Sequence, residues 1–323
     1  MDSAHLPVGM VLLGVTVGFL ALRYFSRAKS GEFRPWGWLG LGMLVLFETL
    51  IVFRVGWVST FFTPLCWTAY LLLADAAVCS LKGSSRLSHS PRGFLLLALA
   101  SIPLWLIFEA YNLRMQNWTY VGLPAHPILR NFGYAWSFAT IWPAIFETAD
   151  LLQALGLFSR PVRPHATFSR TYRTTLAVAG ILCLTVPVMV PVGIGQYLFA
   201  LVWVGFVLLL DPLNYAWAGR SLLRDWEKGD ASLFWSFMIA GLVCGVFWEF
   251  WNYWAAARWL YIFPILQGWK IFEMPLPGFL GFPAFAVECF VMFESVKVLG
   301  KGLFGARQGN RVCRPRTPAA APE

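Results

Sequence analysis

Residues 60–81 read TFFTPLCWTAYLLLADAAVCSL, and Asp75 is the only charged side chain among them. A helix needs roughly 20 such residues to cross the hydrocarbon core of a bilayer. The whole chain has the same character, since 58% of its 323 residues are hydrophobic, 13% are charged and 17 are Trp. An ordinary soluble domain carries about twice that charged fraction. The sequence therefore predicts an integral membrane protein.

Apolar segments of similar length recur along the chain and predict about nine transmembrane helices. A continuous apolar run satisfies its backbone hydrogen bonds within one helix, so we expect an all-α polytopic bundle rather than a barrel. Pro187 and Pro191 interrupt the sixth segment, where a kinked or re-entrant helix also fits. The predicted helices lie near 8–24, 36–53, 60–81, 94–111, 132–157, 175–191, 195–211, 233–254 and 278–298.

Positive charge is distributed unevenly between the loops on the two sides of the membrane. Five of the 25 Lys and Arg residues fall on one side of the membrane, namely Arg54, Arg114, Arg130, Arg258 and Lys270. The other 20 share the opposite side, which the positive-inside rule assigns to the cytoplasm. We expect a multi-pass protein of the bacterial inner membrane, with its N-terminus outside and its C-terminus cytoplasmic. The net charge of +9 then predicts contact with anionic lipid headgroups at the cytoplasmic face, and no nucleic acid partner.

Two copies of one sequence pattern lie about 140 residues apart. Trp67 and Asp75 correspond to Trp203 and Asp211 at one constant offset. The further matched pairs are Glu109 with Glu249, Asn112 with Asn252, Trp118 with Trp259, Tyr120 with Tyr261, and Glu147 with Glu288. Shared residue types in the same order at nearly constant offsets indicate an internal duplication. Four helices in each copy mean that both copies insert in the same orientation, as parallel repeats.

The repeat divides the chain into five predicted segments. Residues 1–35 form an N-terminal transmembrane helix and a basic loop, 36–160 the first four-helix repeat, and 161–174 a basic linker. Residues 175–300 form the second repeat. Residues 301–323 form a basic tail, rich in Pro and Ala, that the composition predicts to be disordered.

Acidic residues inside the predicted helices are the first candidates for a functional site, because ionisable groups are costly in a bilayer. The seven are Glu48, Asp75, Glu109, Glu147, Asp211, Glu249 and Glu288. Asp75 and Asp211 lie near helix ends, where a structural role such as pairing with a headgroup or a loop arginine is favoured. The remaining carboxyls include two that belong to Glu-x-x-Asn pairs.

The Glu-x-x-Asn spacing places Glu109 beside Asn112, and Glu249 beside Asn252, on one face of a helix. An amide there can orient or hydrogen-bond the carboxyl. A polar clamp between helices, catalysis and ligand binding all stay open for these pairs. Gly241 shares the face of Glu249, which predicts the close approach of a neighbouring helix.

Aromatic residues are dense around these carboxyls, among them Trp118, Tyr120, Trp248, Trp259 and Tyr261. Trp and Tyr at the membrane boundary commonly form an interfacial belt. The alternative is the lining of a site for an apolar or cationic ligand, since the face of an aromatic ring attracts positive charge. The four His residues lie outside the predicted helices and no nucleotide-binding motif occurs, so we expect neither a metal nor a cofactor.

The segments FWEFWN (247–252), Trp259-Leu-Tyr261 and EMPLPG (273–278) give the second copy a family resemblance. They are similar to the small membrane lycopene cyclases of the bacterial heterodimeric and fungal bifunctional type, which act in carotenoid biosynthesis. That family also repeats a helical unit. Pro277 and Gly278 stand where the family has paired glutamates, so this chain lacks that acid and base pair.

The resemblance implies cofactor-independent acid catalysis on an isoprenoid, in which a carboxylic acid kept neutral by burial protonates an alkene. It implies Glu249 and Glu109 as acids and Glu288 and Glu147 as bases. The residues that it implies for substrate binding are Asn112, Asn252, Trp118, Tyr120, Trp248, Trp259 and Tyr261. Two other functions stay open, a carrier of a lipid or small solute with a path past Glu147 and Glu288, and a membrane scaffold without catalysis.

Overall fold

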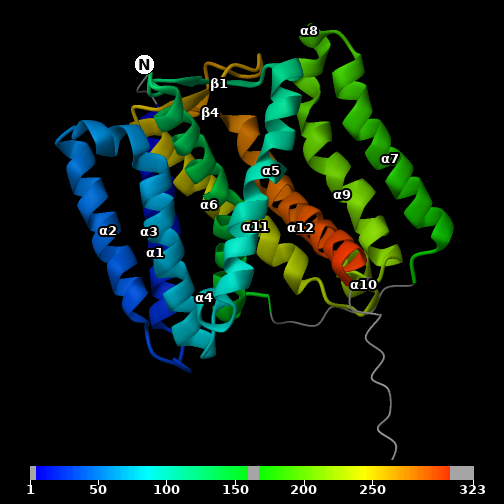
Figure 1. Ribbon diagram of the computed structural model, residues 1–323, viewed down its shortest axis with the longest axis horizontal. Coiled ribbons are helices and arrows are strands. Elements are labelled where there is room, and N and C mark those ends of the chain that lie inside the picture. Colours follow the sequence, from blue (N-terminus) through cyan, green and yellow to red (C-terminus); the bar gives the residue numbers. More distant parts are fainter. Residues whose placement is uncertain (1–4, 159–166, 306–323) are drawn as a thin grey trace, which may run out of the picture.

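The computed structural model describes residues 5–158 and 167–305, with side chains described up to residue 300. Long helices dominate it and run roughly side by side (Figure 1). They are α1 (Leu6–Phe25), α2 (Pro35–Val52), α3 (Gly56–Lys82), α5 (Pro91–Met115), α6 (Pro127–Ala154), α7 (Arg170–Met189), α9 (Phe199–Ala216), α11 (Ser232–Trp254) and α12 (Gly281–Gly305). The all-α polytopic bundle predicted from the sequence is confirmed.

Eight helices in the described residues are long and apolar enough to cross a membrane. Of the nine predicted helices, α6 is the one not among them. It spans 28 residues but carries Arg130, Glu147 and Asp150 together with several amides and hydroxyls. From Phe138 to Leu152 most of its side chains are buried, so the neighbouring helices shield it from lipid.

Prolines lie inside several helices, and Pro187 does not end the helix that contains it. α7 continues through Pro187 and ends at Met189, and Pro191 then precedes the short helix α8 (Val192–Gly195). A 3₁₀ turn, η2 (Gln196–Leu198), leads from α8 into α9. In α3 the backbone departs from helical angles at Phe61, three residues before Pro64. Such bends are expected where proline removes a backbone donor.

Short elements close the two ends of the bundle (Figure 1). At the end that carries few basic residues, β1 (Trp118–Val121) pairs with β2 (Arg258–Tyr261), and β3 (Lys270–Ile271) pairs with β4 (Met274–Pro275). The 3₁₀ helix η3 (Leu276–Leu280) joins β4 to α12. At the other end lie α4 (Arg86–His89) and α10 (Leu222–Glu227). The strands are an addition to the predicted fold, which named helices alone.

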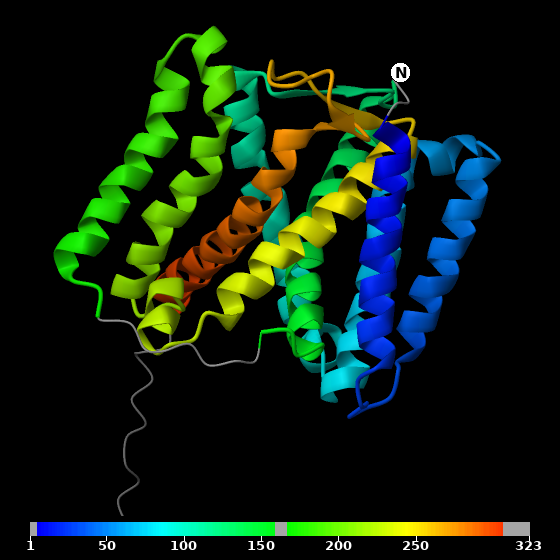
Figure 2. The same ribbon diagram turned by 180° about the vertical axis from the view of Figure 1, so that it is seen from behind.

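The helices of the two predicted repeats have corresponding neighbours. α2 packs on α3 as α7 packs on α9, α3 on α6 as α9 on α12, and α5 on α6 as α11 on α12. α6 also packs on α11 and joins the two groups. α1 lies outside both groups and packs against α11, as the view from behind shows (Figure 2). The division into two repeats remains an interpretation of the sequence, and these contacts agree with it.

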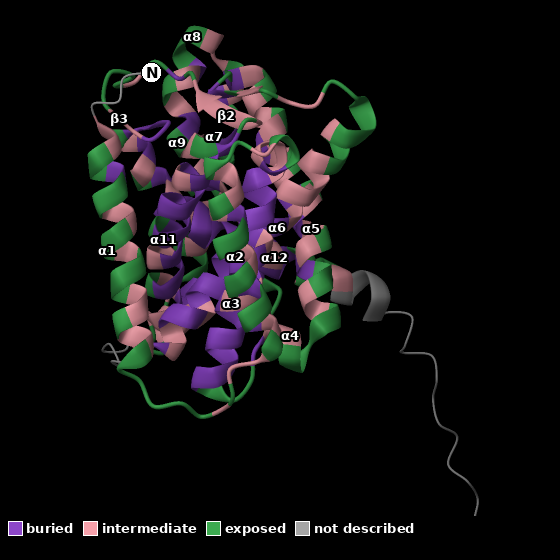
Figure 3. Ribbon diagram, turned by 90° about the vertical axis from the view of Figure 1, so that its left-hand side faces the viewer, coloured by how far each residue is buried: buried purple, intermediate pink, exposed green. Residues whose placement is uncertain are grey.

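Burial separates the helices into an inner and an outer set (Figure 3). α3, α11 and α12 are buried over most of their length, whereas α1, α2 and α7 expose most of their apolar side chains. In a bilayer, lipid covers such outer faces, so their exposure carries no aqueous penalty. Among the described residues the core includes the fully buried side chains of Trp67, Trp142 and Phe62.

Candidate functional site

The two Trp-x-Tyr segments pair with each other. β1 and β2 run antiparallel, with Trp118 opposite Tyr261 and Tyr120 opposite Trp259. Each Trp of one segment therefore faces the Tyr of the other, as a local twofold relationship requires. The pairing brings together the two ends of helices, α5 and α11, that carry the Glu-x-x-Asn pairs.

Each asparagine of these pairs holds the strand that follows it. Asn252 accepts a hydrogen bond from the Trp259 backbone N–H over 3.0 Å and donates to the Trp259 carbonyl over 2.9 Å. Asn112 makes the same two bonds with Trp118, over 3.0 and 2.9 Å. The sequence left a bond between each amide and the neighbouring carboxyl open, but among the described residues both amides bind the strand backbone instead. The backbone groups beyond each helix end need partners, and the amides supply them.

Tyrosine hydroxyls bind the carboxyls instead. Tyr261 donates to Glu249 Oε1 over 2.8 Å, and its own oxygen accepts from Trp259 Nε1 over 2.8 Å. Glu249 is fully buried, and its second oxygen has no hydrogen-bond partner among the described residues. The result is a chain of polar groups that runs from Trp259 through Tyr261 to Glu249.

Glu109 occupies the corresponding place in the first half of the chain. Its Oε1 accepts from the Tyr120 hydroxyl over 2.5 Å, from Trp105 Nε1 over 2.8 Å and from Trp118 Nε1 over 3.2 Å. Glu109 is half-buried, in contrast to Glu249. The two carboxyls thus share a tyrosine partner but differ in the number of donors and in exposure.

Both tyrosines retain their protons at physiological pH. Burial, reinforced by the nearby Glu249 carboxyl, raises the pKa of Tyr261 well above its ordinary value. Burial and the Glu109 carboxyl raise the pKa of Tyr120 in the same way. Each hydroxyl is therefore available as a hydrogen-bond donor or as a link in a proton transfer.

A cavity opens beside the two tyrosines, and its walls are mainly aromatic. It encloses about 1260 Å³ of space free of protein atoms, its open mouth included. The aromatic residues that line it are Phe61, Trp67, Trp105, Phe108, Trp118, Tyr120, Tyr134, Phe138, Phe199, Trp203, Trp248, Trp259, Tyr261, Phe282 and Phe285.

Five of the predicted substrate-binding residues line this cavity, namely Trp118, Tyr120, Trp248, Trp259 and Tyr261. The sequence did not single out Trp67, Trp203 or Phe285 as lining residues. A signal for the two tryptophans was present, because Trp67 and Trp203 are matched positions of the repeat. Arg130 and Arg258 also line the cavity, and no sequence motif pointed to them.

Glu147 and Glu288 lie apart from the cavity lining. Both are fully buried, in α6 and α12, and neither oxygen of either carboxyl has a hydrogen-bond partner among the described residues. Unpaired buried carboxyls are costly, which marks the two positions as unusual. Neither carboxyl is part of the cavity lining, so the lining does not support the predicted base role of Glu147 and Glu288.

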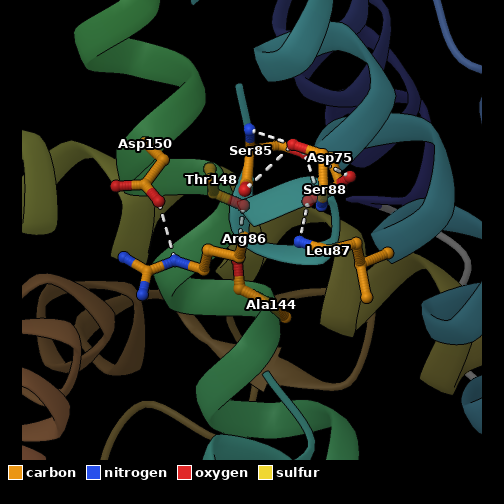
Figure 4. A network of polar contacts seen from close by, with 8 residues as sticks. All are labelled: Asp75, Ser85, Arg86, Leu87, Ser88, Ala144, Thr148 and Asp150. Atoms are coloured by element: carbon orange, nitrogen blue, oxygen red, sulfur yellow. Dashed lines mark hydrogen bonds and ion pairs between the residues drawn. The ribbon is translucent and has the colours of Figure 1, made fainter. Parts of the chain in front are cut away.

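Asp75 and Asp211 each bind the start of the short helix that follows them. Asp75 accepts from the Ser85 hydroxyl over 2.8 Å and from the Leu87 backbone N–H over 2.9 Å (Figure 4). Asp211 accepts from Ser221 over 2.9 Å and from the Leu223 N–H over 3.0 Å. These carboxylates therefore cap α4 and α10, because the first N–H groups of a helix lack partners within it.

The sequence left pairing of Asp75 with a loop arginine open, but the nearby loop arginine, Arg86, binds another residue. Arg86 forms an ion pair with Asp150 of α6, with 2.7 Å between Nε and Oδ2 (Figure 4). Asp75 instead receives a third hydrogen bond, from Trp36 Nε1 over 2.9 Å. The structural role predicted for Asp75 thus has a different set of partners from the one expected.

Glycines permit the helix approach predicted beside Glu249. A Cβ atom on Gly241 would lie 2.2 Å from the Phe282 carbonyl oxygen, and one on Gly245 would lie 2.2 Å from the Phe282 ring. Real Cβ atoms do not come so close, so α12 approaches α11 at these two positions only because they are glycines. The predicted close packing is confirmed, and it fixes one wall of the cavity through Phe282.

Comparison of the chain with models of protein families, with curated proteins and with solved structures found no match in any of the three.

Proposed function

We propose that this integral membrane protein is a cofactor-independent enzyme that carries out acid and base chemistry on an isoprenoid in the aromatic cavity. The observation that carries the proposal is the meeting of Tyr120 and Tyr261 at one cavity, each bound to a carboxyl behind it. Aromatic walls suit an apolar chain, and their ring faces stabilise a carbocation. The sequence resemblance to the membrane lycopene cyclases agrees with this chemistry.

The acid role falls to Glu249, acting through Tyr261. Glu249 forms no ion pair among the described residues, and burial of an unpaired carboxylate is costly, so the residue is suited to hold a proton. In the acid form Glu249 donates to the Tyr261 oxygen while Tyr261 passes its own proton to an alkene carbon. The π electrons form the new C–H bond, and the adjacent carbon becomes a cation that a second double bond attacks to close a ring.

The base role falls to Glu109, acting through Tyr120. Tyr120 takes a proton from the carbon next to the cation while its own proton moves to Glu109, and the C–H electrons restore a double bond. Glu109 suits this role because two indole N–H groups besides the tyrosine stabilise its carboxylate form. The net reaction is an isomerisation that neither oxidises nor reduces the substrate. Solvent exchange returns the proton to Glu249.

The test is the isoprenoid content of a carotenoid-producing bacterial host. Such a host contains both hydrocarbon carotenoids and their phosphorylated precursors, so extracts are analysed by chromatography and mass before and after phosphatase treatment. Wild type is expected to yield a product with the mass of its precursor and a new retention time. Glu249→Gln should abolish that product while the amount of folded protein stays the same.

Glu48→Gln is the matched control, because Glu48 is a helix carboxyl that accepts from Trp251 Nε1 over 2.8 Å and, unlike Glu249, is not bound by a tyrosine of the cavity. It should leave the product unchanged. If the profiles with wild type and empty vector are identical, or if Glu249→Gln retains the product, the acid role is refuted. The carrier alternative predicts redistribution of an isoprenoid between membrane leaflets without a new product.

A further inference from the structure

Two arginines give the aromatic cavity a cationic border. Arg130 lies in the first turn of α6, and Arg258 is the first residue of β2, so both stand at the strand end of the bundle. They belong to the five Lys and Arg residues on the side that is otherwise poor in positive charge. Both side chains are partly exposed, so their guanidinium groups can be reached by an anion at the border of the aromatic lining.

Two other basic residues at this end have partners in the protein. Arg114, in the last turn of α5, donates to the Val190 carbonyl over 2.8 Å at the end of α7 and does not line the cavity. Lys270, in β3, donates to the Tyr261 carbonyl over 3.4 Å. These two side chains therefore bind the backbone of the protein itself.

The two arginines that line the cavity have N–H groups without a hydrogen-bond acceptor among the described residues. The Arg130 side chain forms no hydrogen bond or ion pair with any residue that the structure describes, and its backbone N–H donates to the His126 carbonyl. Arg258 donates through Nη1 to the Tyr253 carbonyl over 2.9 Å, and its Nη2 lies 3.7 Å from Glu273 Oε1. That separation exceeds a hydrogen bond, and a guanidinium has five N–H donors. Both side chains can therefore accept a further anionic partner.

We propose that the cavity binds a long apolar chain that ends in a phosphate or diphosphate, with the chain among the aromatic rings and the headgroup on Arg130 and Arg258. The proposal rests on the isoprenoid site described above and specifies its substrate class. The planar guanidinium fork fits phosphate oxygens in pairs, which gives both affinity and orientation. A pure hydrocarbon would give the Arg130 side chain no partner and would leave the remaining N–H donors of Arg258 unused.

A fixed headgroup has a consequence for the chemistry. Protonation of a double bond leaves the phosphate ester intact, so the headgroup acts as an anchor and is not consumed. The distance from the arginines to Tyr261 then selects which double bond along the chain meets the hydroxyl. Binding energy at a remote group is used in this way to position the reacting atoms.

The experiment measures ligand binding to the full-length protein in detergent by quenching of tryptophan fluorescence. The probes are farnesyl diphosphate, farnesol, inorganic pyrophosphate and phosphatidic acid, each at the same detergent concentration and without divalent cations. Wild type should bind farnesyl diphosphate at least about 10-fold more tightly than farnesol, because hydrogen bonds to charged groups contribute strongly. Inorganic pyrophosphate alone should compete weakly, since it lacks the chain.

Arg130→Gln and Arg258→Gln should each weaken farnesyl diphosphate binding about 10- to 100-fold. Farnesol affinity should stay the same in both variants, which also shows that they are folded. Arg114→Gln is the matched control and should change neither affinity. If phosphatidic acid displaces farnesyl diphosphate at equal concentration, the phosphate comes from a phospholipid rather than a prenyl ester, and dependence on the arginines still supports the headgroup site.

Equal affinities for farnesyl diphosphate and farnesol in wild type would overturn the inference and leave the isoprenoid cavity intact. Binding of neither probe would also overturn it. An arginine-dependent preference for the diphosphate, together with an unchanged isoprenoid profile in Glu249→Gln, would support the headgroup site and refute the acid chemistry. The two proposals therefore fail separately.

Discussion

Tyr120 lies directly opposite Trp259 in the β1–β2 pair, although the two residues come from different halves of the chain. Tyr120 binds Glu109, and Trp259 donates to the hydroxyl that binds Glu249. One two-stranded pair therefore holds both carboxyl systems at the same cavity. The arrangement makes the strand pair, rather than either helix alone, the element that sets the site.

Tyr261→Phe separates a proton relay from simple packing. The variant removes the hydroxyl between Trp259 and Glu249 and keeps the ring that lines the cavity. We expect product formation to fall at least about 100-fold, in the range typical of a lost general acid. Tyr111→Phe is the control, because Tyr111 donates to the Leu184 carbonyl outside the cavity. Full activity in Tyr261→Phe would assign proton transfer to another group.

Asn252→Ala tests the clamp on β2. Both hydrogen bonds to the Trp259 backbone are lost, which should lower the free energy of unfolding by about 1–3 kcal/mol. Thermal unfolding in detergent measures the change. Asn252→Asp keeps the acceptor and loses the donor, so its loss of stability should be smaller than that of Asn252→Ala. A normal melting temperature for Asn252→Ala, combined with an altered pH profile, would instead support the amide–carboxyl contact that the sequence suggested.

Asp211→Asn tests the cap on α10. Asp211 accepts from two backbone N–H groups and from Ser221, and an amide offers one oxygen in place of two. We expect a loss of about 1–2 kcal/mol in stability, as for other helix caps. Asp225→Asn serves for comparison, because among the residues that the structure describes the Asp225 side chain has only a 3.8 Å ion pair with Arg220. Equal melting temperatures for the two variants would argue against the cap.

Gly241→Ala tests the contact between α11 and α12. The added methyl group would meet the Phe282 carbonyl at 2.2 Å, so the helices must separate at a cost of about 1–3 kcal/mol. Gly18→Ala in α1 has no atom within 4 Å of the new methyl group and should be neutral or slightly stabilising. Melting curves of both variants decide the point. A destabilised Gly18→Ala would show that the comparison reports helix propensity or lipid contact instead.

Orientation in the membrane is tested by labelling of single cysteines in intact cells. The distribution of basic residues places Ser90 in the cytoplasm and Gln116 outside, and both positions are exposed. A membrane-impermeant thiol reagent should label Gln116→Cys and leave Ser90→Cys unmodified until the cells are opened, in a background where the native cysteines are replaced. The opposite pattern would reverse the orientation, and labelling at both positions would refute the crossing of the membrane by α5.

The sequence by itself determined the membrane class, the positions of the long helices and the correspondence between matched residues. These follow from local composition, since an apolar run of sufficient length has no alternative to a helix in lipid. It also pointed to Trp118, Tyr120, Trp248, Trp259 and Tyr261, which line one cavity. The density of aromatic residues around the carboxyls of the two matched segments, together with the family resemblance, led to that prediction.

Tertiary structure decided which polar groups meet. The pairing of Trp118 with Tyr261 joins residues far apart in sequence, and strand pairing has no local signal in segments of four residues. Asn252 binds the Trp259 backbone, a contact that spacing along the helix does not reveal. Arg130 lines the cavity because of the way α6 packs in the bundle. Glu147 and Glu288 match in sequence yet lie off the cavity, because the angle at which a helix faces its neighbours depends on packing. Spacing along a helix fixes a face, and only the assembled bundle fixes what that face contacts.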